Sequence, residues 1–146
     1  MKRSPLKRKT PLVRGTSQLK RSNLKPRNVE RAAAERLRDF GPQAEWMRDL
    51  PCSTCGARPP SEPSHVGHSR GAGGTRDDLA PQCPDCHRAV HRGRLTFERE
   101  RGVALAELAQ EYAARWLALS EIDRTRCVLL FRQRWPTAGR LLDSGS

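Results

Sequence analysis

Apolar residues beyond position 28 recur mostly three or four positions apart, a spacing that predicts a chain built mainly of helices. Asn28 is a suitable N-cap for a helix over residues 29–40, which the Gly41-Pro42 pair would end. A second, shorter helix over residues 42–50 would follow it.

The same spacing predicts two further helices between residues 101 and 135. The first, over residues 103–119, would be amphipathic and about five turns long. We expect Ser120 to be the N-cap of the second helix. Residues 137–146 are expected to form a flexible tail. The apolar stripe of the first helix, which we expect to pack in the core, consists of Val103, Leu108, Tyr112, Trp116 and Leu119.

The segment 51–93 has a different pattern. It is rich in Pro, Gly, Cys and His and has few periodic apolar positions, which is typical of loops organised by a metal. We expect short strands at residues 64–66 and 94–97 and a short helix over residues 86–91.

Cysteines provide the most specific signal in this segment. Cys52 and Cys55 form one Cys-x-x-Cys pair and Cys83 and Cys86 form another, the spacing with which two knuckles bind one structural Zn²⁺. Disulfides and redox motifs are the alternatives. The chain opens with no secretory signal, so we expect a cytoplasmic protein of a bacterium or phage-infected host, where disulfides are disfavoured. Cys127 lies in an apolar run and is expected to be a buried small hydrophobe.

The charge is concentrated at the start of the chain. Of a net charge of +12, residues 1–28 carry ten Lys and Arg and no Asp or Glu, so we expect a disordered basic arm ahead of one small domain over residues 29–136. The arm repeats a Ser/Thr-x-Leu-base unit that suits binding along a nucleic-acid backbone. Membrane binding is the competing use, but no lipidation signal or transmembrane run accompanies it. The arm residues expected to contact nucleic acid are Lys7, Arg8, Lys9, Lys20 and Arg21.

Histidines add candidate chemistry to the cysteine segment. His65 has a side chain suited to activate water, and His87 and His91, four apart on a short helix, could bind one divalent metal. His68 is a third candidate ligand. These histidines could instead bind zinc, or the unit could be a zinc knuckle that only binds nucleic acid. The arginines around them that could hold a phosphate backbone are Arg70, Arg88 and Arg92.

Residues 52–91 resemble the zinc-bearing HNH endonucleases of the ββα-metal class. The shared pattern is Cys-x-x-Cys, a strand ending in His, a Gly-Gly loop, a polar residue before Leu, and Cys-x-x-Cys-His with another His four residues on. The basic segment ahead of it is similar to that of small phage-encoded members, including the recombination-enhancement (Ref) and NinG-like groups.

The resemblance implies a role for each matched residue. His65 would be the general base, Asp78 would hold its imidazole, and His87 and His91 would bind the catalytic Mg²⁺ or Mn²⁺. Ser64 stands where many relatives carry a first His or Asp that binds this metal. The resemblance therefore implies either that the metal has only two protein ligands or that His68 or Asp78 replaces the third.

We therefore expect an α+β fold, with a zinc-stapled ββα-metal module, flanking helices and a disordered basic arm. The expected function is metal-dependent cleavage of DNA in phage recombination or processing, with DNA bound mainly through its backbone and a recombinase–DNA filament as a candidate partner. The alternative is a non-catalytic zinc protein that binds DNA and assists recombination. RNA as the substrate and the oligomeric state are left open.

Overall fold

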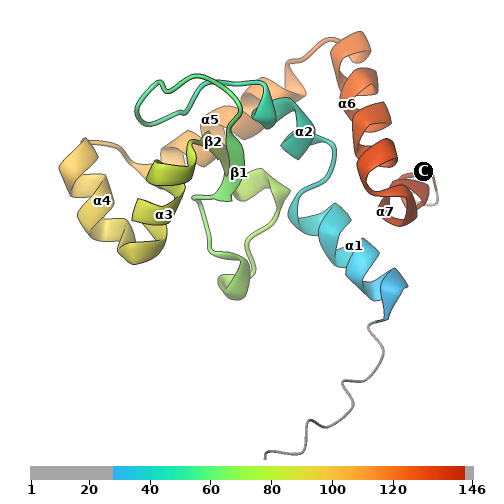
Figure 1. The fold of residues 1–146 in the computed structure, drawn as a ribbon, viewed down its shortest axis with the longest axis horizontal. Helices are drawn as coiled ribbons and strands as arrows, with labels where there is room; N and C mark the ends of the chain where they lie inside the picture. Colours follow the sequence, from blue (N-terminus) through green and yellow to red (C-terminus); the bar gives the residue numbers. More distant parts are fainter. Residues whose placement is uncertain (1–27, 144–146) are drawn as a thin grey trace, which may run out of the picture.

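The computed structural model describes residues 28–143. It has an α+β fold that is mostly helical, with one small two-stranded sheet (Figure 1). The elements are, in order, α1 (Val29–Asp39), α2 (Gln43–Arg48), β1 (Glu62–His65), η1 (Arg70–Ala72), η2 (Arg76–Asp78), β2 (Leu79–Gln82), α3 (Pro84–Arg92), α4 (Arg94–Arg101), α5 (Leu105–Leu117), α6 (Glu121–Arg134) and α7 (Pro136–Arg140).

The sheet is an antiparallel pair that leads directly into a helix. β1 pairs with β2 so that Glu62 lies opposite Gln82 and His65 opposite Leu79. The chain then turns at Cys83, whose sulfur caps the start of α3. The strand predicted at residues 64–66 is confirmed, with a start two residues earlier.

Helices cover the sheet and extend the molecule to both sides (Figure 1). α2 and α5 pack against the strands, α3 and α4 form a corner at one end, and α1, α6 and α7 gather at the other end. The main core lies where α2, the sheet and α5 meet, and it includes the fully buried Met47, Val66, Leu79 and Leu105. Because both cysteine pairs border this core, the predicted metal site and the core are one structural unit.

A second, smaller group of apolar side chains joins the remaining helices. We call it the distal cluster; its buried members are Ala33, Phe131 and Ala138. Between it and the main core, the buried Glu45 of α2 binds Arg48 and also Arg134 of α6, at 3.4 and 3.5 Å. This ion pair connects α6 to the half of the molecule that carries the cysteines.

The predicted helices are largely confirmed. Asn28 caps α1 by accepting a hydrogen bond from the backbone N–H of Arg31, and Ser120 caps α6 in the same way through Asp123. In α5, Tyr112 is buried as predicted, but its buried partners are Leu105 and Ala109. The remaining residues of the predicted stripe, Val103, Leu108, Trp116 and Leu119, are only partly buried.

The strand predicted at residues 94–97 is wrong, because these residues begin α4. Leu95 and Phe97 suggested the alternation of a strand, yet Leu95 is 80% exposed and only Phe97 enters the core. The strand that pairs with β1 is β2, which is buried at every position and contains a proline. A strand covered on both faces has no alternating pattern to recognise.

The chain also differs from the expected flexible tail, since α7 follows α6 after a single residue. Pro136 ends the preceding helix but occupies the first turn of the next, where its missing N–H is no loss. Ala138 packs into the distal cluster and fixes α7 in place. Of the predicted basic arm, residues 1–28, all but Asn28 lie outside the described residues, and Asn28 caps α1. In the described part, no helix has the length and apolar character needed to cross a membrane.

Candidate metal and catalytic site

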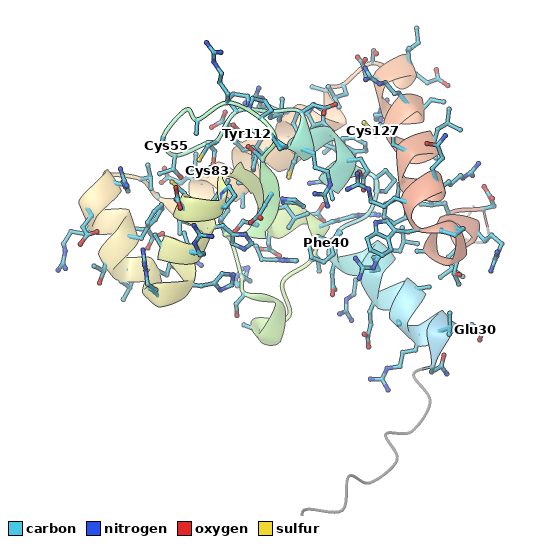
Figure 2. All side chains as sticks on the ribbon, viewed as in Figure 1. Glu30, Phe40, Cys55, Cys83, Tyr112 and Cys127 are labelled. Atoms are coloured by element: carbon cyan, nitrogen blue, oxygen red, sulfur yellow. The ribbon has the colours of Figure 1, made fainter. Side chains whose placement is uncertain are left out.

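The four paired cysteines lie together and could hold a zinc ion. Their sulfur atoms all lie within 4.8 Å of one another, and the sulfurs of Cys55 and Cys83 are 3.7 Å apart. Figure 2 shows these two residues side by side, where the loop after α2 meets the start of α3. Four sulfurs bound tetrahedrally to Zn²⁺ at 2.3 Å would be about 3.8 Å apart, whereas a disulfide needs about 2.05 Å. The distance therefore fits shared coordination and excludes a disulfide.

The electrostatics of the cluster point the same way. Burial opposes ionisation of Cys52, but backbone N–H groups, led by that of Cys83, outweigh it and lower the pKa of this thiol to about 7. Burial and the neighbouring sulfurs raise the pKa of Cys86. The protein thus stabilises one thiolate readily, while further negative charge among the packed sulfurs needs a bound cation.

His87 and His91 face each other on α3, as their spacing predicted. Their Nε2 atoms are 3.0 Å apart and their ring centroids 4.8 Å apart. Two nitrogens that bind one octahedral ion at neighbouring positions, at 2.1 Å, would be about 3.0 Å apart. The pair therefore offers two converging ligand atoms for a divalent ion.

Glu62 fixes the orientation of His87. Its Oε2 lies 2.7 Å from Nδ1 of His87, which leaves Nε2 to face His91. A carboxylate on the remote nitrogen of a ligand histidine sets the tautomer and raises the basicity of the ligand atom. Sequence reasoning missed Glu62, because only the pairing of β1 with β2 brings it to α3 across 25 positions of sequence.

His65 ends β1 and is partly buried. Its ring meets that of Phe40 edge to face, at 5.0 Å between centroids, and its Nε2 atom is buried. Phe40, which directly follows α1, was not among the residues that the sequence singled out.

Asp78 binds His68. Its Oδ1 lies 2.8 Å from Nδ1 of His68 and also accepts the backbone N–H of His68 at 3.1 Å. Burial raises the pKa of the Asp78 carboxyl, but the N–H of Thr75 and the contacts with His68 outweigh it, so the pKa is lowered. The carboxylate thus stays ionised at neutral pH. Asp78 was predicted to hold the imidazole of His65, whereas the imidazole that it contacts in the structure is that of His68.

The structure does not bring His68 to the His87–His91 pair as a third ligand. Within residues 28–143, the four cysteines are the one group of three or more potential ligand residues that lie together. Water would have to complete a coordination sphere begun by the two histidines.

The predicted phosphate-binding residues are only partly described. Arg88 is exposed on α3, where it pairs with Asp85, and Arg92 is exposed at the end of the same helix. Arg70 begins η1. The arm residues Lys7, Arg8, Lys9, Lys20 and Arg21 lie outside the described part of the chain.

No family model, curated protein or solved structure matches the chain.

Proposed function

We propose that the chain is a metal-dependent DNA endonuclease of the HNH type, stapled by a structural zinc ion. The single observation that carries the proposal is the His87–His91 pair, whose Nε2 atoms converge at 3.0 Å on the helix that follows an antiparallel strand pair. Zinc at the cysteines does not need these histidines. Their 3.0 Å separation is a hydrogen-bond distance between the two rings, and it also matches two neighbouring ligands of one octahedral ion.

In this proposal the two histidines hold a divalent ion, Mg²⁺ or Mn²⁺, with Glu62 orienting His87. The ion would supply Lewis-acid stabilisation of the phosphate and of the leaving oxygen. Because imidazole suits transition metals better than it suits Mg²⁺, we expect activity to be higher with Mn²⁺.

His65 is the proposed general base. It ends β1 and would take a proton from the attacking water. Its contact with Phe40 limits rotation of the ring. A positioned base contributes about 10²- to 10⁴-fold to the rate.

DNA would be held through its backbone. Arg88 and Arg92 lie on the same helix as the histidine pair, and the basic segment 1–27 adds charge that favours a polyanion. The resemblance to phage proteins makes recombination or DNA processing the process to test first, with a recombinase–DNA filament as a candidate partner.

The test is cleavage of supercoiled, single-stranded, branched and recombinase-paired DNA, with and without Mg²⁺ or Mn²⁺. Wild type is compared with His65→Ala and with Ser69→Ala, an exposed neighbour outside the proposed machinery. Zinc content and circular dichroism establish that each variant is folded. We expect cleavage that requires the divalent ion, is lost in His65→Ala and is retained in Ser69→Ala. Binding of every DNA without cleavage by any protein would instead support the non-catalytic zinc protein.

A further inference from the structure

The loop after β1 presents a second imidazole that the proposed function has not used. His68 lies three residues beyond His65, and its side chain is 73% exposed. Its Nδ1 is occupied by Asp78 at 2.8 Å, so Nε2, on the far side of the ring, is the nitrogen available to a substrate. The pair is an exposed imidazole with a fixed orientation.

Asp78 is itself held firmly. Its second oxygen, Oδ2, accepts the backbone N–H of Thr75 at 2.8 Å, and its carbonyl accepts the N–H groups of Val66 and Gly67 at 2.8 and 3.0 Å. The side chain is only 19% exposed. The carboxylate therefore joins both ends of the loop and has little freedom to turn away from His68.

Two glycines make this arrangement possible. A Cβ on Gly67 would overlap with Oδ1 of Asp78 and lie 3.2 Å from the Cβ of Ala109, and a Cβ on Gly74 would overlap with the carbonyl oxygen of His68. Neither residue has a positive φ, so close approach of the backbone is what requires glycine at both positions. The loop packs around the backbone of His68 and leaves its imidazole ring exposed to solvent.

The loop is also tied to the helix corner that carries the metal-binding pair. Arg94, the first residue of α4, donates a hydrogen bond to the carbonyl oxygen of Gly67, immediately before His68. His91 lies three residues before Arg94, near the end of α3. This contact ties the His68 loop to the start of α4, three residues after His91.

We propose that His68 is the general acid of the nuclease reaction and that Asp78 is its positioning residue, an inference that rests on the proposed function. His65 and His68 have contrasting surroundings, one packed against Phe40 and one exposed against a carboxylate, which suits different proton-transfer roles. Water attacks phosphorus and gives its proton to His65. The bond from phosphorus to the leaving 3′ oxygen breaks, and that oxygen takes a proton from Nε2 of His68. Both imidazoles then return to their starting states by proton exchange with solvent.

A change of leaving group distinguishes a general acid from a general base or a metal ligand. The two substrates are duplex DNA and the p-nitrophenyl ester of thymidine 5′-phosphate, in which p-nitrophenolate replaces the 3′ oxygen and departs without a proton. His68→Ala should lose about 10²-fold or more on DNA but no more than roughly threefold on the ester. Asp78→Asn should show the same contrast, with a loss of about tenfold on DNA. His65→Ala should lose activity on both substrates.

Matched controls are available beside each residue. Ser69→Ala and Asp77→Asn alter exposed neighbours and should retain both activities. His68→Asn keeps a donor toward Asp78 but has no transferable proton, so it should behave as His68→Ala does even if the alanine variant folds poorly. Mn²⁺ binding, followed by electron paramagnetic resonance on zinc-loaded protein, should be unchanged in all His68 variants.

Three results would overturn the inference. Equal losses on DNA and on the ester would place His68 in another role, and weakened Mn²⁺ binding would make that role a ligand. Full activity of His68→Asn on DNA would show that no proton comes from this residue. If wild type cleaves neither substrate with any divalent ion, the proposed function fails and the general acid with it.

Discussion

Loss of the proposed zinc ion from the four-cysteine cluster should unfold the half of the molecule that carries the histidines. The perturbation is Cys86→Ser, or exposure of wild type to a strong zinc chelator. Cys52 and Cys86 are each only 3% exposed and belong to the main core with Met47 and Leu79. The two cysteine pairs also join the loop after α2 to the start of α3.

The expected size follows from two free energies. A structural zinc site contributes about 10–16 kcal/mol at neutral pH, whereas a domain of this length has a total stability of about 5–15 kcal/mol. Removal of zinc would therefore lower the free energy of unfolding by about as much as the total stability of the domain. The distal cluster contains no cysteine ligand and joins α1, α6 and α7, so these helices should retain more structure.

Hydrogen exchange followed by mass spectrometry measures both halves at once. In the metal-free protein we expect exchange of the β1, β2 and α3 amides to rise about 100-fold or more, which corresponds to about 2.7 kcal/mol, and exchange in α6 to rise much less. Cys127→Ser is the matched control, because Cys127 is buried at α6 and lies outside the ligand group. One zinc per chain should be lost with the first perturbation and kept in the control. Unchanged zinc content, or unchanged protection of β1 and β2, in Cys86→Ser would show that zinc bound by this cysteine does not stabilise that half of the fold.

Three further predictions concern the rest of the site. Glu62→Gln should weaken Mn²⁺ binding about 10- to 100-fold, measured by titration of zinc-loaded protein, because His87 loses the carboxylate on its Nδ1; unchanged affinity would contradict the orienting role. Gly67→Ala should lower the melting temperature and reduce the free energy of unfolding by about 1–3 kcal/mol, because a Cβ there meets Asp78. Gly71→Ala is the control and should be nearly neutral, because a Cβ there meets nothing within 4 Å. Equal effects of the two substitutions would contradict the packing argument. Burial raises the pKa of the Cys127 thiol, so less thiolate is present at a given pH. Native zinc-loaded protein at pH 8 should therefore resist alkylation of Cys127 by iodoacetamide until denaturant is added. Rapid labelling of Cys127 in the native protein, detected by mass spectrometry, would contradict this prediction.

Features set by local sequence were predictable. The cap of α1 at Asn28 and the cap of α6 at Ser120 depend on side chains that bond within their own first turn. The two Cys-x-x-Cys pairs predicted one cluster because each pair forms a knuckle by itself. His87 and His91 share a face for the same reason, since four residues make about one helical turn.

Features set by contacts between distant segments were not predictable. β2 is covered on both faces and contains a proline, so its sequence carries no strand pattern. Leu95 and Phe97 alternate like a strand, yet both lie in α4, where Phe97 is buried and Leu95 is exposed. Glu62 meets His87, and Asp78 meets His68, only because β1 and β2 pair in one register. The carboxylate partners of His68 and His87 therefore had to come from the fold.

We propose that this chain hydrolyses DNA with a divalent ion held by His87 and His91. The most direct test is the rate of nicking of supercoiled plasmid as Mn²⁺ is raised, for zinc-loaded wild type and for His87→Ala and His91→Ala that retain their zinc. We expect Mn²⁺-dependent nicking by wild type and little or none by either variant at any Mn²⁺ concentration. Nicking by both variants at the wild-type rate, or none by wild type with Mn²⁺ or Mg²⁺, would contradict it.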